Sequence, residues 1–496
     1  MSTVYFVVGL VVYIGFMIAI GAWCAKGKSN GEDYLTGGGQ LPFFLIFATL
    51  SASFIGTGSS VGATANGLRF GWGASAFGLG TALGLILLVI SVNKRSVREK
   101  NFKTMSEEAQ FLFGGKKKIK YLFAILMMVG QTVALGTHIT GGATYLSYIT
   151  GIDMLIAKII TVFAFGVYLI IGGYLAVVWT DLIQVIILLI GFITITIMII
   201  PKAGGWSGIV NTLETTGAGG NLSLYGIKSM GLLPCLATMA SVFLTQNGSS
   251  VVRLRIYTSK DDKTARNSLL SAAVVAFVFS FIPAIIGMAA YTIATKEGIT
   301  SIFETPDYTF SFIASHVLGP VLGLLFLISG LSATLSSGDS DTIATVTIFI
   351  EDIVPMLKGK RVDEKSMSRV SRYATFGILI FAFISTMFAS DIMSYITNVM
   401  GAIMPALAVA MLVGNLWERA TWQGAYISTI VGTVAGLAYL VIAPVKEYVT
   451  NVFGGPAIPL GVLSLMLIVA VSLVTPEDKT SDKEKMDRVI ALREGR

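Results

Sequence analysis

The residues of this sequence most able to do chemistry are polar side chains inside strongly apolar segments. Asp181 lies within GGYLAVVWTDLIQVIILLIGFITITIMII, residues 172–200, a run apolar enough to cross a bilayer. A carboxylate at that depth costs a few kcal/mol on insertion scales, so it normally faces a protein interior, a partner or an ion path. The sequence therefore predicts a functional role for Asp181.

A second polar cluster is SGLSATLSSGDSDTIAT, residues 329–345. Ser336, Asp339 and Ser340 are spaced i, i+3 and i+4, so on a helix they share one face. Hydroxyl and carboxylate oxygens are the ligands that hard cations prefer. Hydroxyls that bond back to a carbonyl four residues earlier would explain the serines without any ion, but they do not explain Asp339 and Asp341. The cluster favours a cation site.

Two apolar segments carry signs of a broken helix. SASFIGTGSSVGATANG, residues 51–67, combines four glycines with five hydroxyls in its first ten residues, and TMASVFLTQNGSS, residues 238–250, places Gln246 and Asn247 beside a glycine. Small-residue helix packing is the simpler reading of any one glycine. Unwound backbone at membrane depth is tolerated where protein buries it or a cavity hydrates it. A pair of interrupted helices in two halves of a chain points to a transporter's binding site.

The elements that must hold these residues are membrane helices. Of the 496 residues, 54% are hydrophobic and 13% charged, with a mean hydropathy of +0.78, whereas soluble domains carry about 25% charged residues. We expect an all-α polytopic membrane protein with about 13 transmembrane helices of roughly 20 residues each. The candidate spans are 4–25, 42–68, 74–93, 121–149, 153–172, 176–200, 226–250, 267–294, 309–350, 373–390, 393–415, 422–443 and 457–475. The 309–350 stretch is too long for one simple span, so it breaks or runs on.

The distribution of basic residues predicts the orientation. With the N-terminus outside, 29 of the 35 lysines and arginines fall in the segments 26–41, 94–120, 251–266, 351–372, 416–421 and 476–496, which would then all be cytoplasmic, in agreement with the positive-inside rule. The net charge of +7 therefore does not indicate nucleic acid. Residues 476–496 mix both signs, and we expect a solvated cytoplasmic tail. No loop is long enough for a catalytic domain, and no metal, nucleophile or phosphate motif indicates an enzyme.

Five motifs give the chain a specific resemblance to a known family: DYLTGGGQLP at 33–42, SASFIG at 51–56, GGYLAVVWTDLIQ at 172–184, VVRLRIYTSKDDKTAR at 251–266 and SATLSSGDSDTIATVTIFIEDIV at 332–354. In this order and spacing they resemble the sodium:solute symporter family of proline, pantothenate, sugar and sialic-acid carriers. The resemblance implies one transporter domain over 1–475. Its five-plus-five inverted-repeat core, of the bacterial leucine-transporter type, would have repeats at about 42–200 and 226–415, with one helix before it and two after.

The resemblance also implies site residues. The main sodium site would use the carbonyls of Ala52, Ile55 and Ala333 and the hydroxyls of Ser336 and Ser337. A second cation site, which some members carry, would use Asp181, Ser336, Asp339 and Ser340. By position, the residues that could line the solute pocket are Phe54, Gly56, Ser59, Gln131, Phe243 and Gln246, although Phe54 and Phe243 could equally be packing residues.

These observations lead us to predict a sodium-driven symporter of the plasma membrane, which imports a small organic solute by alternating access. No lysine or arginine lies in the apolar segment around Gln131, where acidic-sugar carriers of the family place an arginine. We therefore expect an amino acid or a short carboxylate rather than a large anionic sugar. A proton-coupled carrier that uses Asp181 and Asp339 is the first alternative, and a channel or a sensor is a more distant one. The sequence leaves the sodium stoichiometry and the oligomeric state open and is compatible with a monomer.

Overall fold

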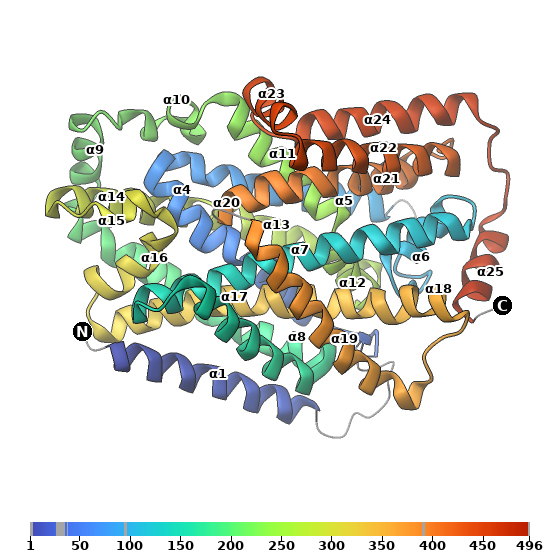
Figure 1. The fold of residues 1–496 in the computed structure, drawn as a ribbon, viewed down its shortest axis with the longest axis horizontal. Coiled ribbons are helices and arrows are strands. Elements are labelled where there is room, and N and C mark those ends of the chain that lie inside the picture. The colour runs from blue at the N-terminus through green and yellow to red at the C-terminus, as the bar shows by residue number, and fades with distance from the viewer. Residues whose placement is uncertain (1–2, 26–34, 37, 94–96, 389–391, 495–496) are drawn as a thin grey trace.

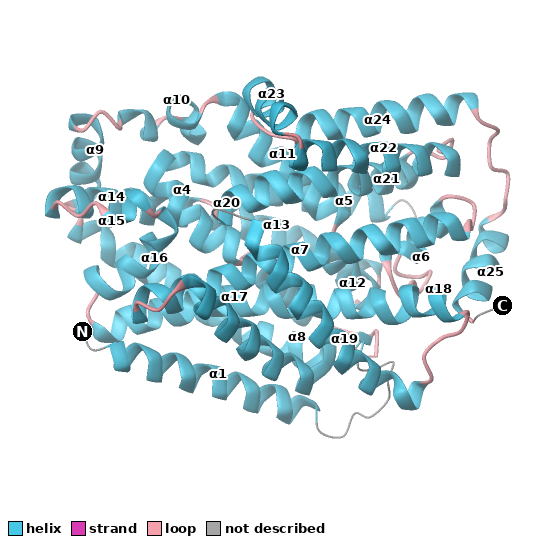
Figure 2. Cartoon of the chain, viewed as in Figure 1, coloured by secondary structure: helices cyan, strands magenta, loops and turns pink. Residues whose placement is uncertain are grey.

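Most of the long helices of the protein run along one common direction, and shorter helices cross it at the two ends (Figure 1). The computed structural model describes residues 3–25, 35–36, 38–93, 97–388 and 392–494. Within these ranges the chain is helical, with short loops and no strand (Figure 2). A single parallel bridge joins Leu41 to Ser259.

The first half of the chain contains the helices from α1 to the second predicted break. They are α1 (Thr3–Ala25), α3 (Phe43–Phe54), η1 (Gly58–Gly62), α4 (Ala63–Phe70), η2 (Gly71–Ala74), α5 (Ser75–Asn93), α6 (Met105–Leu112), α7 (Lys117–Thr150), α8 (Met154–Lys202), α9 (Gly205–Thr215), η3 (Gly219–Leu222), η4 (Leu224–Gly226), α10 (Ile227–Met230) and α11 (Leu232–Gly248).

The second half continues in the same way to the C-terminal region. Its helices are α12 (Ser250–Thr258), α13 (Asp262–Phe279), α14 (Phe281–Glu297), α15 (Ser301–Glu304), η5 (Pro306–Tyr308), α16 (Thr309–Phe312), η6 (Ile313–Val317), α17 (Pro320–Ile348), η7 (Phe349–Ile353), α18 (Val354–Lys358), α19 (Glu364–Ser385), η8 (Thr386–Phe388), α20 (Ile392–Ser394), η9 (Tyr395–Met400), α21 (Gly401–Leu416), α22 (Trp422–Val441), α23 (Ala443–Phe453), α24 (Ala457–Val474) and α25 (Asp482–Arg493).

Ten of the described helical segments are long and apolar enough to cross a membrane, and Phe43–Phe54 and Met154–Gly166 are shorter apolar helices. The chain is therefore a multi-pass membrane protein, and the count of about 13 spans stays a prediction. The stretch 309–350 both breaks and runs on: it is interrupted at Leu318 and Gly319, and its second part extends through α18. Between the spans predicted at 153–172 and 176–200, α8 kinks at Gly173, whose φ of 61° suits glycine.

The first predicted helix break is confirmed. Helix α3 ends at Phe54, Ile55 has the non-helical angles φ −84° and ψ 63°, and helical structure resumes as η1. Ser59 and Ser60 donate hydroxyl hydrogen bonds to the backbone carbonyls of Phe54 and Gly56, at 2.8 and 2.6 Å. These two hydroxyls are hydrogen-bond donors to backbone carbonyls that lack an intrahelical partner where the helix is interrupted.

The second predicted break is also confirmed, and a short helix follows it directly. Helix α11 ends at Gly248, and Ser249 is extended at φ −84° and ψ 121°. Residues 251–258, predicted as part of a cytoplasmic loop, form the buried helix α12. Arg253 and Arg255 are fully buried there, because acidic partners from distant helices pair with them.

The C-terminal segment departs from the expectation of a solvated tail. Helix α25 lies beside α6 at one end of the bundle (Figure 1). Val489 is fully buried, and the guanidinium of Arg493 binds the carboxylate of Glu107 at 3.0 and 2.6 Å. The tail therefore packs on the transmembrane body.

Candidate ion and solute sites

Backbone carbonyls at the end of α3 meet hydroxyls from the middle of α17. The Ser336 hydroxyl donates to the carbonyls of Ala52 and Ala333, at 3.0 and 3.2 Å. The Ser337 hydroxyl donates to the carbonyls of Ala52 and Ser53, at 3.3 and 2.9 Å. All these oxygens are buried or nearly so. The structure thus brings together four of the five residues predicted for the main sodium site.

Ile55, the fifth, lies three residues beyond Ala52 at the point where α3 ends. The close approach there depends on Gly56, because a Cβ atom at that position would lie 2.3 Å from the Ser337 hydroxyl. The assembled groups are neutral oxygen donors, which is the chemistry that sodium requires. A cation bound between these groups would replace the hydroxyl protons as the partner of the carbonyl oxygens.

Asp181 belongs to a buried cluster that we call the central network: Thr49, Asp181, Arg255 and Ser340. The Thr49 hydroxyl donates to Asp181 Oδ2, and the Arg255 guanidinium lies 3.7 Å from the same oxygen. Arg255 also donates to Ser340 at 2.5 Å and to Thr49 at 3.1 Å. Among the described residues, Asp181 Oδ1 has no hydrogen-bond partner although it is buried.

The central network contains two residues predicted for the second cation site, Asp181 and Ser340. The other two, Ser336 and Asp339, are fully buried on α17, which packs along α8. Arg255 was missed from the sequence, because it was counted as a cytoplasmic charge. The signal that could have found it is the apolar context of VVRLRIY, which alternates arginines with buried residues.

A cavity of about 120 Å³ lies between the two helix breaks. Phe54, Gly56 and Ser59 border it from the first break and Gln246 from the second, while Gln131 borders it from α7. These are five of the six residues predicted for the solute pocket. The sixth, Phe243, is not among the lining residues and instead packs against the apolar cluster that includes Leu244 and Met404.

The cavity wall also holds two residues that were not predicted for it, His138 on α7 and Asp341 on α17. His138 Nε2 lies 3.2 Å from Asp341 Oδ2, and His138 Nδ1 lies 3.0 Å from the hydroxyl of Thr57. Asp341 stood in the polar cluster on α17, but nothing in the sequence links it to a histidine about two hundred residues earlier.

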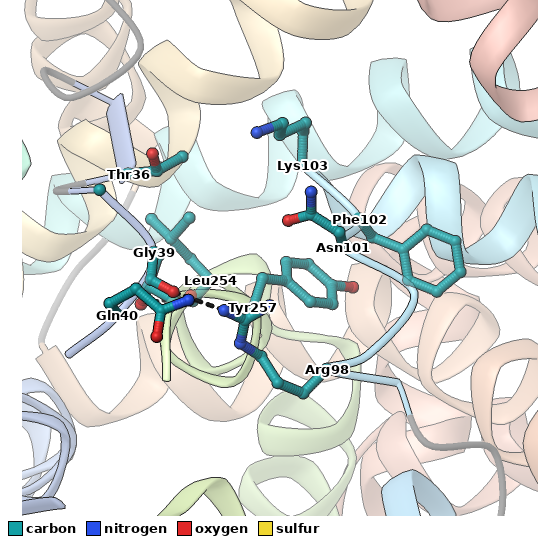
Figure 3. Close-up of a pocket in the computed structure, with 11 residues that line it drawn as sticks. Thr36, Gly39, Gln40, Arg98, Asn101, Phe102, Lys103, Leu254 and Tyr257 are labelled. Atoms are coloured by element: carbon teal, nitrogen blue, oxygen red, sulfur yellow. Dashed lines mark hydrogen bonds between the residues drawn. The ribbon is translucent and has the colours of Figure 1, made fainter. Parts of the chain in front are cut away.

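A larger cavity of about 340 Å³ opens at the end of the bundle near α6 and α12 (Figure 3). Arg98 reaches across it and donates to the carbonyls of Gly39 and Ser259. Tyr257 faces the cavity from α12 and donates its hydroxyl to Glu108 at 2.5 Å. Hydrogen bonds of Arg98 therefore join the segment at Gly39 to the end of α12 at this cavity.

A second set of buried charges, the end network, is centred on α6. Glu107 binds Arg493, and Lys120 lies 3.4 Å from Glu107 and 3.2 Å from Asp352. Burial alone would raise the pKa of Glu107, but the charges of Lys120 and Arg493 more than offset it and hold that pKa at about 2. The neighbouring Glu108 accepts hydrogen bonds from three residues: Arg253 at 2.7 Å, Tyr257 at 2.5 Å and Asn415 at 3.0 Å.

Comparison with known proteins identifies the family. The profile of the sodium:solute symporter family matches residues 34–432. The chain belongs to the sodium:solute symporter family. Relatives include the sodium/glucose cotransporter of Vibrio parahaemolyticus, 24% identical over 86% of this chain and 83% of that one. The sodium/pantothenate symporter of Haemophilus influenzae is 24% identical, over 85% of this chain and 88% of that one.

A solved structure shows the fold. A Na⁺-coupled sialic acid symporter, substrate-bound and outward-open, superposes with a TM-score of 0.77 over 95% of this chain and 98% of that one, at 16% identity. The chain therefore has the fold of the leucine-transporter class, to which this neighbour belongs. As a member of the symporter family, it uses sodium as the coupling ion and has a small organic solute and the bilayer as its other partners.

Proposed function

We propose that this symporter imports an amino acid or a short carboxylate by alternating access, with the N-terminus outside and the C-terminus in the cytoplasm. One observation carries the proposal: the two helix breaks, at Ile55–Gly56 and at Ser249, border the same small cavity. Unwound segments offer carbonyls and amides for ligands at membrane depth. The cavity of about 120 Å³ suits a solute of a few heavy atoms rather than a sugar.

We assign the main sodium site to Ala52, Ile55, Ala333, Ser336 and Ser337. The contacts of Ser336 and Ser337 with the carbonyls at the end of α3 support this assignment. The same short segment then continues to Gly56 and Ser59, which line the cavity. Sodium would fix the segment, and this would order the adjacent cavity for the solute. Coupling is then a reciprocal binding free energy: each ligand tightens binding of the other.

A second cation site at Asp181, Ser336, Asp339 and Ser340 is compatible with the central network only if Arg255 moves away from Ser340. Arg255 lies 2.5 Å from Ser340 and supplies the positive charge beside Asp181. A sodium ion bound to the same two residues would require the guanidinium to withdraw. We therefore propose that the contact of Arg255 with Ser340 and occupancy of the second site exclude one another.

The test is solute uptake into proteoliposomes, run with and without an inward sodium gradient. We expect uptake to depend on the gradient and to increase with an inside-negative potential, which adds about 2.3 kcal/mol per charge per 100 mV. Uptake that follows a pH gradient and ignores sodium would overturn the proposal. A thermal-shift screen of the purified chain against amino acids and short carboxylates, with and without sodium, identifies the solute.

A further inference from the structure

The cavity at the end of the bundle near α6 and α12 has walls suited to an anion. Its described lining combines the guanidinium of Arg98 and the ammonium group of Lys103 with the side-chain amides of Gln40 and Asn101, and includes no carboxylate. Its volume of about 340 Å³ falls within the range of roughly 300–1,000 Å³ found for small-molecule sites. A hollow with two cationic residues and no acid in its described wall attracts negative charge.

Arg98 keeps hydrogen-bond donors for a ligand, although it is 8% exposed. Its Nε and Nη2 atoms donate to the carbonyls of Ser259 and Gly39. A guanidinium carries five N–H donors, so three remain, and Nη1 has no acceptor among the described residues. The two carbonyls fix the guanidinium at the cavity wall, which orients the remaining donors before any ligand binds.

The turn that carries Arg98 is itself held in an unusual conformation. The backbone N–H of Asn101 donates to the carbonyl of Arg98 at 3.2 Å, and Asn101 has a φ of 53°, which is uncommon outside glycine. Arg493 donates to the Asn101 carbonyl at 3.2 Å, and the backbone N–H of Lys103 donates to Glu107 at 2.9 Å. Such conformations persist where the surroundings hold them, often at ligand sites. This one brings three side chains of one short turn to the same cavity.

The acids closest to this turn have contacts outside the cavity lining. Asp262 Oδ1 accepts the backbone N–H of Arg98 at 3.1 Å, and Asp261 caps the start of α13. Glu107 binds Arg493 in the end network. None of these three carboxylates belongs to the described lining. The described wall therefore contributes two positive charges and no negative one.

We propose that this cavity, which we call the anion cavity, binds a phosphate monoester. Such a group carries close to two negative charges and three terminal acceptor oxygens, and guanidinium and ammonium groups are the side chains that bind phosphate best. A carboxylate brings one charge to two cations. The space beyond the phosphate, with the amides of Gln40 and Asn101, suits the polar organic part of the ester. The inference goes beyond the proposed function, and only the location of this end in the cytoplasm rests on the proposed orientation.

A bound ester would join two segments that come together at the cavity. Figure 3 shows Gly39 and Gln40 on one side of it and Asn101 and Lys103 on the other. The first pair precedes α3 and the second pair precedes α6. A ligand that contacts both sides adds to the bond between Arg98 and Gly39. Because a ligand that binds only the folded chain stabilises it, binding is measurable as a rise in melting temperature.

The experiment is thermal unfolding of the purified full-length chain in detergent, titrated with glycerol 3-phosphate up to millimolar concentrations. Acetate and glycerol are the controls for charge and for the organic part, with potassium salts at matched ionic strength throughout. We expect a saturable rise with glycerol 3-phosphate only. A second arm uses vesicles of phosphatidylcholine with and without phosphatidate, which carries the same phosphate group on a lipid. A response to phosphatidate alone would assign the phosphate group to a lipid rather than to a soluble ester.

Variants locate the effect. Lys103→Gln removes one charge of the wall and should raise the half-saturating concentration about tenfold, because it removes a charge-assisted hydrogen bond. Arg98→Gln should weaken binding at least as much. Lys260→Gln, at an exposed position at the same end of the bundle but outside the lining, is the matched control and should behave like the wild type. If Arg98→Gln does not fold, Lys103→Gln and the ligand comparison decide.

Three outcomes would overturn the inference: no saturable response to either form of the phosphate group, a response to acetate equal to that to glycerol 3-phosphate, or an unchanged half-saturating concentration in a folded Lys103→Gln. The last result would place the phosphate elsewhere on the molecule. Sodium dependence of uptake is a separate measurement, so none of these outcomes affects the proposed function.

Discussion

The central network and the end network are both buried and both charged, yet they are built differently. In the end network each carboxylate of α6 has short contacts, including 2.6 Å from Arg493 to Glu107 and 2.7 Å from Arg253 to Glu108. In the central network Arg255 lies 3.7 Å from Asp181, and the second oxygen of that carboxylate has no hydrogen-bond partner within the described part of the chain. The tight network suits a structural role, and the loose one can exchange partners with an ion.

The largest effect is expected from breaking the end network. Glu108→Ala removes the partner of three residues and leaves the fully buried Arg253 without its carboxylate. Loss of one member of a buried pair costs about 3–5 kcal/mol. Thermal unfolding in detergent measures the loss, and sodium should not restore it. Glu304→Gln, at an exposed position, is the control and should stay within about 0.5 kcal/mol of the wild type.

The central network should respond to the same kind of change with a smaller and reversible loss. Arg255→Gln leaves the carboxylate of Asp181 without its positive neighbour, so we expect a loss of about 1–3 kcal/mol in potassium. Sodium can supply that charge, so the melting temperature should recover in sodium more than it does for Glu108→Ala. Equal responses of the two variants to sodium would contradict the distinction between the networks.

A comparison of the two networks with the helix breaks also shows which features of the structure could be predicted from the sequence and which could not. The helix breaks were predictable because glycines and hydroxyls are dense at 51–67, and because 238–250 places Gln246 and Asn247 beside a glycine in an apolar segment. Both signals are local in the sequence. The pairing of Ser336 and Ser337 with the end of α3 came from the resemblance; the structure shows their hydroxyls in contact with the carbonyls of α3, and the sodium site itself stays a prediction.

Charge pairing across the chain was not predictable. Arg253 and Glu108 are 145 residues apart, and a rule that counts basic residues per loop assigns such an arginine to the cytoplasm. His138 and Asp341 likewise meet only because α7 packs against α17. Phe243 was wrongly predicted to line the cavity, because the position of a residue along a helix does not show which face of that helix borders the cavity. The domain boundaries and the count of spans stay predictions.

Acid should weaken the end network at Glu107. Its folded-state pKa of about 2 lies below the ordinary value of 4.5, so its contribution to stability is present above about pH 4.5 and is lost as the pH falls towards 2. Arg493→Gln removes one of the two charges that lower this pKa. In the variant the folded-state pKa of Glu107 should lie closer to 4.5, so the loss of stability in acid should be smaller and should level off at a higher pH than in the wild type.

Melting temperatures between about pH 3 and pH 7 test this shift. Lys483→Gln removes a positive charge from an exposed position on the same helix and serves as the control. If both variants followed the same pH profile, the contact between Arg493 and Glu107 would not set the pKa.

The smallest effect is expected at a single hydroxyl of the main sodium site. Ser337→Ala removes one oxygen, worth about 1 kcal/mol, so the sodium half-saturation of uptake should rise by up to about tenfold with little change in stability. Ser329→Ala is the matched control, because this buried serine lies two turns earlier on α17 and bonds to the carbonyls of Leu325 and Ile187. An unchanged half-saturation in Ser337→Ala would show that the site is misassigned.

Helix α12, which follows the break at Ser249, contacts both charge networks. Arg253 and Arg255 are two residues apart, so they point in nearly opposite directions around a helix that turns about 100° per residue. One arginine is anchored to Glu108 in the end network and the other reaches Asp181 in the central network. A helix of nine residues is too short to absorb a displacement by bending. A rigid displacement of α12 that withdrew Arg255 from Asp181 would therefore also shift Arg253 relative to Glu108, so this short helix links the ion path to the charges around α6.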